Sequence, residues 1–418
     1  MKKKNYLIVL MIMVTFFVIS FLTNILGSIN PSVSKSFNLS QTLAGFLPFA
    51  FFIAYGVMSI PAGFMVEKFG EKKMMLFAFL LAFIGSVLFA VIPDFKIFLI
   101  SLFTIGTGMA ILQVVINPLL RAAGGEEHYA FNSVLAQLIF GAASFVAPLV
   151  YSNIVVGMEK NEGFMNDLFS ELTTKGLEWV AIYWIFAALT VLMLVFIIIV
   201  KFLKVELKDD EKTGTVGSYI ELFKNKTVIL YFFGIFAYVG TEQGISYWMS
   251  KFLQEYHGYD FKTVGAEAVG NFWGLMTIGG ILGLFLLKIM DSKLVLKIFT
   301  ILAIISFAMA LFADPKLSLK SFQFSGFFLS VMYPIIFSLA LNSVNKHHGS
   351  FAGILVTGIM GGAVVQLLIG FISDLVSLKV GMGFVFVTLA YILSIGFWSK
   401  PLINNATIKM KRGSKNEA

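Results

Sequence analysis

The 418-residue chain contains no cysteine and little charge, because Asp, Glu, Lys and Arg together make up only 13% of it. The missing cysteine excludes disulfides, thiolate metal sites and a cysteine nucleophile. With 58% hydrophobic residues, the chain cannot be a water-soluble globular protein, whose surface needs far more charge. We therefore expect a polytopic membrane protein that contacts the lipid bilayer.

The sequence also lacks the motifs of common enzymes and nucleotide-binding proteins. No Ser-His-Asp arrangement, zinc-ligand spacing or phosphate-binding Gly-Lys-Ser/Thr motif is visible. All four histidines, His128, His257, His347 and His348, lie at expected loops or span ends, which disfavours a buried histidine relay. We predict neither an enzyme nor a resident cofactor or metal, apart from a coupling ion.

Long apolar runs dominate what the sequence does contain. A membrane-spanning helix needs about 20 apolar residues, and the chain has twelve such runs. They cover 6–29, 41–66, 74–92, 96–120, 131–155, 179–203, 227–250, 264–287, 293–313, 321–343, 351–373 and 381–399. The first run is too long for a signal peptide and has no clear cleavage site, so we expect a retained span.

The positive charges predict the orientation in the membrane. With both termini inside, nine of the 31 Lys and Arg residues fall outside and the other 22 inside. The nine are Lys35, Lys96, Lys160, Lys175, Lys251, Lys262, Lys316, Lys320 and Lys379. Cytoplasmic loops carry an excess of Lys and Arg, so we expect both termini in the cytoplasm. The same clustering explains the net charge of +8 without a nucleic-acid partner.

A polar segment divides the chain at its midpoint. We expect an all-α protein with an N-terminal six-helix bundle (1–203), a cytoplasmic linker (204–226) with a short amphipathic helix at 219–223, and a C-terminal six-helix bundle with a cytoplasmic tail (227–418). The halves echo each other, since Asn117-Pro118 matches Tyr333-Pro334 at an offset of 216 residues. Such repeats are typical of transporters that enclose a central path.

A single carboxylate, Glu242, stands near the middle of the apolar segment 228–249. A charge in hydrocarbon costs several kcal/mol unless it faces a cavity or a partner, so such residues mark functional sites. Glu242 is therefore the candidate for binding or ion coupling. The alternative is an architectural role, in which the carboxylate is hydrogen-bonded to a neighbouring helix.

The loop between the second and third spans resembles the cytoplasmic signature of the major facilitator superfamily. It reads Gly63-Phe-Met-Val-Glu67-Lys68-Phe-Gly70-Glu71-Lys72-Lys73. In that signature the glycines permit close helix approach and a turn, and an acid pairs with a basic residue. Glu67 stands where Asp is usual, and Glu71 where Arg is usual. The resemblance implies a cytoplasmic gate that includes Gly63, Glu67, Lys68, Gly70 and Lys72.

Six further motifs are similar to those of the fucose:proton symporter and glucose/galactose transporter family. They are Pro61-Ala-Gly63, Leu112-Gln-Val-Val-Ile-Asn-Pro118, Tyr238-Val-Gly-Thr-Glu242, Phe272-Trp-Gly-Leu-Met276, Tyr333-Pro-Ile-Ile-Phe-Ser-Leu339 and Gly370-Phe-Ile-Ser-Asp374. The resemblance implies a major facilitator fold and sugar transport by alternating access. It also implies a bacterial inner-membrane protein that works as a monomer on a monosaccharide of hexose type.

The chain departs from this family at positions that the family uses for chemistry. Asn24 in the first span and Gln113 in the fourth align with acids of the fucose symporter, and Gly280 stands where glucose-type relatives tend to carry Arg. An amide can hydrogen-bond a hydroxyl-rich ligand but has no proton to exchange near neutral pH. Coupling to H⁺ would then rest on Glu242. Sodium is the competitor, because a carboxylate with amide and carbonyl oxygens also binds hard cations.

Polar side chains inside the spans are the candidates for substrate contacts, because their cost is tolerated where they face a wet cavity. They are Asn24, Gln113, Asn117, Gln137, Gln243, Asn271 and Tyr333, with Trp273 as a surface for stacking a sugar ring. Gln113 and Asn117 are four residues apart and share a helix face. Each amide has an alternative role in joining helices, and Asn117 could instead satisfy backbone groups freed by Pro118.

The residues leave more than one function open. Loss of both family acids would suit an uncoupled sugar facilitator, whereas 46 Phe and 19 Met residues could line the adaptable cavity of a drug or amphipath exporter. A sugar-sensing receptor would need a signalling domain, and spans with short loops account for the chain. We favour cation-coupled import of a monosaccharide.

Overall fold

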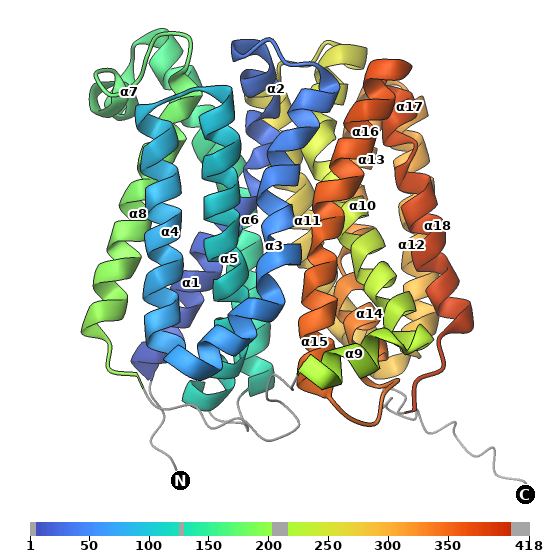
Figure 1. Ribbon diagram of the computed structural model, residues 1–418. Helices are drawn as coiled ribbons and strands as arrows, with labels where there is room; N and C mark the ends of the chain where they lie inside the picture. Colours follow the sequence, from blue (N-terminus) through green and yellow to red (C-terminus); the bar gives the residue numbers. More distant parts are fainter. Residues whose placement is uncertain (1–5, 125–128, 203–215, 403–418) are drawn as a thin grey trace, which may run out of the picture.

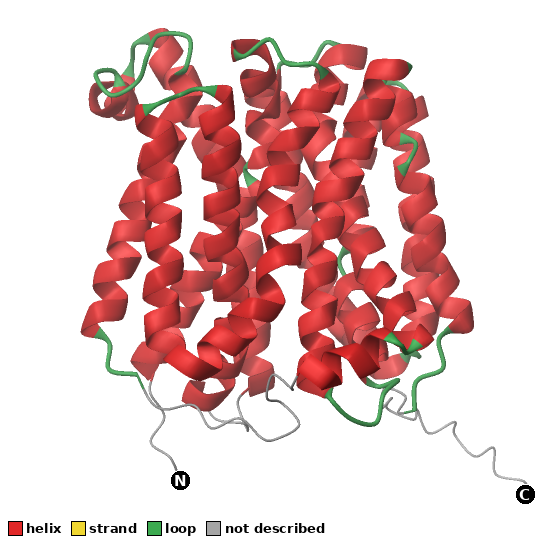
Figure 2. Cartoon of the chain, in the orientation of Figure 1, coloured by secondary structure: helices red, strands yellow, loops and turns green. Residues whose placement is uncertain are grey.

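The computed structural model describes residues 6–124, 129–202 and 216–402, and within these ranges the regular structure is entirely helical (Figure 2). The α-helices are α1 (Tyr6–Asn24), α2 (Leu26–Ser36), α3 (Gln41–Phe69), α4 (Glu71–Val91), α5 (Phe95–Gly124), α6 (Tyr129–Lys160), α7 (Gly163–Phe169), α8 (Ala181–Ile199), α9 (Val216–Phe223), α10 (Lys226–His257), α11 (Ala266–Ile289), α12 (Ser292–Phe312), α13 (Pro315–Leu329), α14 (Met332–Leu341), α15 (His348–Thr357), α16 (Gly361–Leu375), α17 (Leu378–Met382) and α18 (Val385–Trp398). Three short helical turns complete them: η2 (Glu178–Val180), η4 (Phe261–Gly265) and η5 (Gly358–Met360).

Twelve membrane-length helical segments lie in the described ranges, which confirms the predicted number of spans. The first runs over Tyr6–Ser36, because α1 and α2 follow each other with a break at Ile25. It is longer than the predicted span 6–29, since α2 continues through a polar stretch. Four polar side chains of that stretch, Ser28, Asn30, Ser32 and Ser34, are nonetheless buried.

The two halves of the chain lie side by side, with α1 to α8 on the left of Figure 1 and α9 to α18 on the right. We call the end where α1 begins and α18 ends the terminal face. The opposite end, where α2 ends and α3 begins, is the distal face. The long helices run between these two faces, so residues near the middle of a span lie midway between them (Figure 1).

Small residues bring α3 of the first half against α16 of the second. A Cβ at Gly45 would press on the backbone of Gln366, and one at Gly362 would press on the ring of Phe52. Without water to drive association inside a bilayer, helices join through such close backbone approach. This seam therefore holds the halves together along one side.

Polar contacts close the distal face between the halves. The hydroxyl of Tyr247 on α10 donates to the carbonyl of Ala44 at 2.6 Å, and Asn30 of α2 donates to the carbonyl of Tyr247 at 3.3 Å. Nearby, Lys262 and Glu159 form an ion pair. At this face the two halves are therefore bound to each other.

The carboxylate of Asp374, at the end of α16, adds a further bond between the halves. It accepts the backbone N–H groups of Gln41 and Thr42, which open α3, at 2.8 Å each. The first N–H groups of a helix have no partner within the helix, and the helix dipole favours negative charge there. Asp374 thus caps a helix that belongs to the other half.

The packing of α6 against α11 differs along their length. Midway, Gly141 of α6 leaves no room for a Cβ beside Thr277 of α11. One turn closer to the terminal face, Gln137 is exposed on α6, and a Cβ at Gly280 of α11 would meet nothing within 4 Å. An exposed amide at this depth suits contact with water.

Replacing Asp374 with Ala is expected to favour opening of the distal face. The exposed cap contributes about 1 kcal/mol, so the ratio of open to closed molecules should rise roughly fivefold. The chain has no cysteine, so spin labels at Lys160→Cys and Lys316→Cys, both exposed at the distal face, can report the distance between the halves.

Asp291→Ala is the matched control, because Asp291 caps α12 within its own half through Lys293 and Leu294. It should leave the distance distribution unchanged. An unchanged distribution in Asp374→Ala would contradict a role for this cap in closing the face.

Candidate functional site

Glu242 lies half-buried on α10, about midway between the two faces. The side-chain nitrogen of its neighbour Gln243 donates to Glu242 Oε1 at 3.1 Å. The hydroxyl of Tyr238, one helical turn earlier, also reaches this carboxylate. The ring of Tyr238 lies 5.7 Å from that of Tyr333 on α14, between centroids. Two donors therefore face the carboxylate, next to a pair of aromatic rings.

Asn24, the last residue of α1, approaches the same place from the other half. Its side chain is buried, and its Nδ2 donates to Ser144 Oγ on α6 at 2.8 Å. Ser20 and Ser144 are hydrogen-bonded to each other at 2.6 Å, and Ser20 donates to the backbone carbonyl of Phe140. This serine cluster holds Asn24 in place against α6.

Gln243 connects the two groups of residues. Its Nε2 lies 3.5 Å from Asn24 Oδ1, in addition to its 3.1 Å bond to Glu242. A continuous polar path therefore runs from Glu242 on α10 through Gln243 and Asn24 to Ser144 on α6. The structure brings together Asn24, Glu242, Gln243 and Tyr333 among the residues singled out from the sequence.

The other candidate side chains lie elsewhere. Gln113 is half-buried on α5, and Gln137 is exposed on α6. Asn271 of α11 donates to Glu267, four residues earlier, at 3.3 Å. Trp273 is buried with its ring edge-on to Phe272, 5.2 Å away between centroids.

The side chain of Asn117 lies outside the described residues, although α5 continues through this position. Its predicted role in ligand contact stays a prediction. Sequence reasoning missed Ser20 and Ser144, because a serine in an apolar helix usually bonds a carbonyl of its own preceding turn. Ser20 and Asn24 are four residues apart and therefore share a helix face, which could have indicated that Ser20 belongs to the same polar cluster.

A metal site of several acidic or histidine ligands is not found among the residues that the structure describes. Near Glu242, the amide of Gln243 presents its N–H group to the carboxylate, and Asn24 likewise directs its nitrogen to Ser144. Hard cations need oxygen ligands. The described side chains around Glu242 therefore offer hydrogen-bond donors to its carboxylate.

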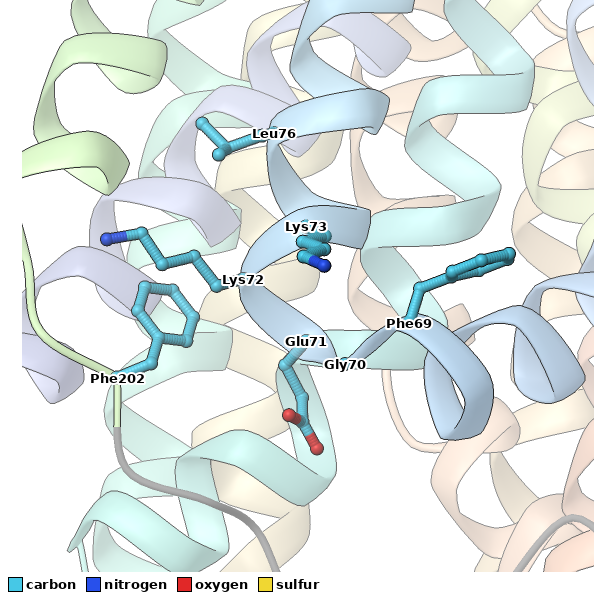
Figure 3. Close-up of a pocket in the computed structure, with 7 residues that line it drawn as sticks. All are labelled: Phe69, Gly70, Glu71, Lys72, Lys73, Leu76 and Phe202. Atoms are coloured by element: carbon cyan, nitrogen blue, oxygen red, sulfur yellow. The ribbon is translucent and has the colours of Figure 1, made fainter.

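The signature loop turns between α3 and α4 at Gly70, whose positive φ of 83° is favourable for glycine. Lys72 extends over the ring of Phe202 and donates to the carbonyls of Ile198 and Val200 at 2.9 and 2.8 Å (Figure 3). These carbonyls end α8, where a positive charge is favourable. Lys72 thus fastens α8 to α4 within the first half.

A surface cavity of about 500 Å³ adjoins this loop. Its lining consists of Phe69, Gly70, Glu71, Lys72, Lys73, Leu76 and Phe202 (Figure 3). Of the other predicted gate residues, Gly63 is buried in α3, and Lys68 lies over the ring of Phe69, 5.3 Å from its centroid. Glu67 lies near the end of α3 and affects Tyr219 of α9 electrostatically.

The helix α9 contains the predicted amphipathic segment 219–223 and touches both halves. Its Tyr219 ring lies 5.9 Å from that of Phe64 on α3, between centroids. On the opposite side, Glu221 forms an ion pair with Lys346 at 2.7 Å. This lysine, assisted by His347, lowers the pKa of the Glu221 carboxyl. The contacts anchor the linker at the terminal face.

Comparisons with known proteins agree with this architecture. The chain is 28% identical to a glucose/galactose transporter of Brucella abortus over 386 residues, which cover 91% of each protein. It is 26% identical to the L-fucose-proton symporter of Escherichia coli, covering 89% of this chain and 88% of the symporter.

The fold matches solved structures of the same architecture. A crystal structure of a Major Facilitator Superfamily transporter in the outward conformation superimposes with a TM-score of 0.68 at 22% identity, covering 94% of this chain and 98% of that one. The sequence model described as Major Facilitator Superfamily matches residues 12–365. The chain is therefore a multi-pass membrane protein that belongs to the Major Facilitator Superfamily, a family of transporters and not of enzymes.

Proposed function

We propose that this protein imports a neutral monosaccharide by alternating access and couples uptake to protons through Glu242. Sugar as the substrate class is supported by the names of the relatives, which include glucose/galactose transporters and a fucose symporter. The central residues agree with it, because amides and tyrosines can both donate to and accept from sugar hydroxyls. The halves 1–203 and 227–418 would move as the two units, joined by the linker 204–226.

The observation that carries the proposal is the placement of Glu242. It is a carboxylate in mid-membrane whose neighbours are neutral donors from α10 and, through Gln243, from the other half. In an alternating-access cycle, a group at this place would exchange a proton with the side to which the transporter is open. Protons are favoured over sodium because the nearby Gln243 and Asn24 direct nitrogen atoms, not oxygen ligands, to their partners at 3.1 and 2.8 Å.

Alternating access requires that sugar and proton bind the two states with different affinity. The contacts between the halves at the distal face, and the exposure of Gln137 nearer the terminal face, support a state that is closed at the distal face. If the terminal face is cytoplasmic, as the lysine distribution predicts, this state would release sugar and proton into the cell. Lys72 and α9 would then support the cytoplasmic end through their contacts with α8, α3 and the loop after α14.

Glu242→Gln is expected to separate exchange from accumulation. The amide keeps the size and hydrogen bonding of the side chain but cannot carry a proton. In proteoliposomes, counterflow of radiolabelled hexoses should persist, whereas accumulation driven by an imposed proton gradient should be lost. An imposed sodium gradient should drive accumulation in neither protein.

Glu267→Gln is the matched control, since Glu267 is an acid near the distal end of α11 that pairs with Asn271. It should keep proton-driven accumulation. Accumulation that survives in Glu242→Gln would show that the coupling site lies elsewhere. Sugar exchange without a response to either gradient in the native protein would identify an uncoupled facilitator.

The cytoplasmic placement of the terminal face can be tested by labelling. A membrane-impermeant maleimide should modify Glu171→Cys, an exposed position near the distal face, in intact cells. It should modify Lys224→Cys, exposed beside α9, only after permeabilisation. The reverse pattern would place the terminal face outside and overturn the proposed direction of import.

A further inference from the structure

Gln243 lies between the carboxylate of Glu242 and Asn24, which belongs to the other half of the protein. Its side chain is buried, with 6% of its surface exposed. The Nε2 atom faces two acceptors, Glu242 Oε1 at 3.1 Å and Asn24 Oδ1 at 3.5 Å. An oxygen placed there would oppose two other oxygens, so the N–H groups must point this way. One NH₂ group thus serves acceptors from both halves.

The acceptor in the first half is held firmly. Asn24 Nδ2 donates to Ser144 at 2.8 Å, and Ser144 is in turn hydrogen-bonded to Ser20 at 2.6 Å. These bonds tie the amide plane of Asn24 to α6, which keeps Oδ1 directed at Gln243. Because Asn24 cannot rotate freely, a movement of the Gln243 side chain changes the contact between α10 and the helices α1 and α6.

The two acceptors compete for the same NH₂ group, and the strength of one of them depends on its charge. Hydrogen bonds to an ionised carboxylate are shorter and stronger than those to a neutral amide oxygen. An ionised Glu242 would therefore draw the NH₂ group of Gln243 towards itself and away from Asn24. When Glu242 takes up a proton, this attraction weakens, and the NH₂ group is free to close on Asn24.

Few other titratable groups face Glu242. On its own helix α10 the neighbour is Tyr238, and from α14 it is Tyr333. On α3, Tyr55 approaches Tyr333 and reaches Thr23 of α1. These phenols exchange protons far above neutral pH. Among the described groups named here, Glu242 is thus the one carboxyl group.

We propose that Gln243 is a positioning residue that transmits the protonation of Glu242 to Asn24 and so sets how tightly the two halves are joined. The inference rests on the proposed proton coupling and names the residue that connects it to movement. Proton release into the cell would draw Gln243 from Asn24, weaken the link between the halves, and allow the distal face to reopen. Protonation would have the opposite effect.

The test measures distance instead of transport. Spin labels at Lys160→Cys and Lys316→Cys report the opening of the distal face in detergent or nanodiscs, without any sugar. In the otherwise native protein, the fraction of molecules with a closed distal face should fall as pH rises. Glu242→Gln should abolish this pH dependence. Gln243→Leu should abolish it as well, although Glu242 is still present.

A swap of the two amides supplies the rescue. Gln243→Asn alone shortens the link by one methylene and should lose the pH-dependent shift. Adding Asn24→Gln restores the combined length and should recover it. A merely structural role for Gln243 would not predict recovery in this pair.

The outcomes separate this inference from the proposed function. If the closed fraction of Gln243→Leu depends on pH as strongly as that of the native protein, the proposed role of Gln243 is wrong. A closed fraction that does not change with pH in the native protein would overturn it as well. A pH-dependent shift that is lost in Gln243→Leu and recovered in the amide swap would support the inference, even if no hexose exchanged in counterflow. In that case only the sugar assignment would fail.

Discussion

The rest of the structure depends on one constraint, the presence of a carboxylate in the middle of an apolar bundle. Burying a charge without partners costs several kcal/mol, which surrounding donors must offset. Glu242 has donors in Gln243 and Tyr238, and Gln243 also reaches Asn24 in the other half. The residue that helps to satisfy this charge thus also links α10 to α1, and through Asn24 to Ser144 of α6.

This arrangement gives the two halves different kinds of contact. Along α3 and α16 they touch through glycines such as Gly45 and Gly362, whose packing is independent of charge. At the centre they meet through the polar path of Glu242, and at the distal face through caps and carbonyl bonds such as those of Asp374 and Tyr247. This combination suits a rocking movement of the two halves. The polar contacts can break and re-form, while the glycine contacts between α3 and α16 stay in place.

The sequence predicted the number of spans correctly, since it follows from the cost of polar groups in hydrocarbon. Asn24, Glu242 and Gln243 were singled out for the same reason; they lie together, and their role in binding or coupling stays a prediction. Their partners Ser20 and Ser144 could not be predicted, because which helix faces which is decided by packing and not by local pattern. For the same reason Asp374 resembled an ordinary charge at a span end, although it caps a helix of the other half.

We propose that protons enter together with the sugar through Glu242. The most direct measurement is the external pH of weakly buffered, de-energised cells or proteoliposomes when a transported hexose is added. We expect alkalinisation that follows hexose entry in the native protein and is absent in Glu242→Gln, while hexose still enters. Hexose entry without any pH change in the native protein would contradict it.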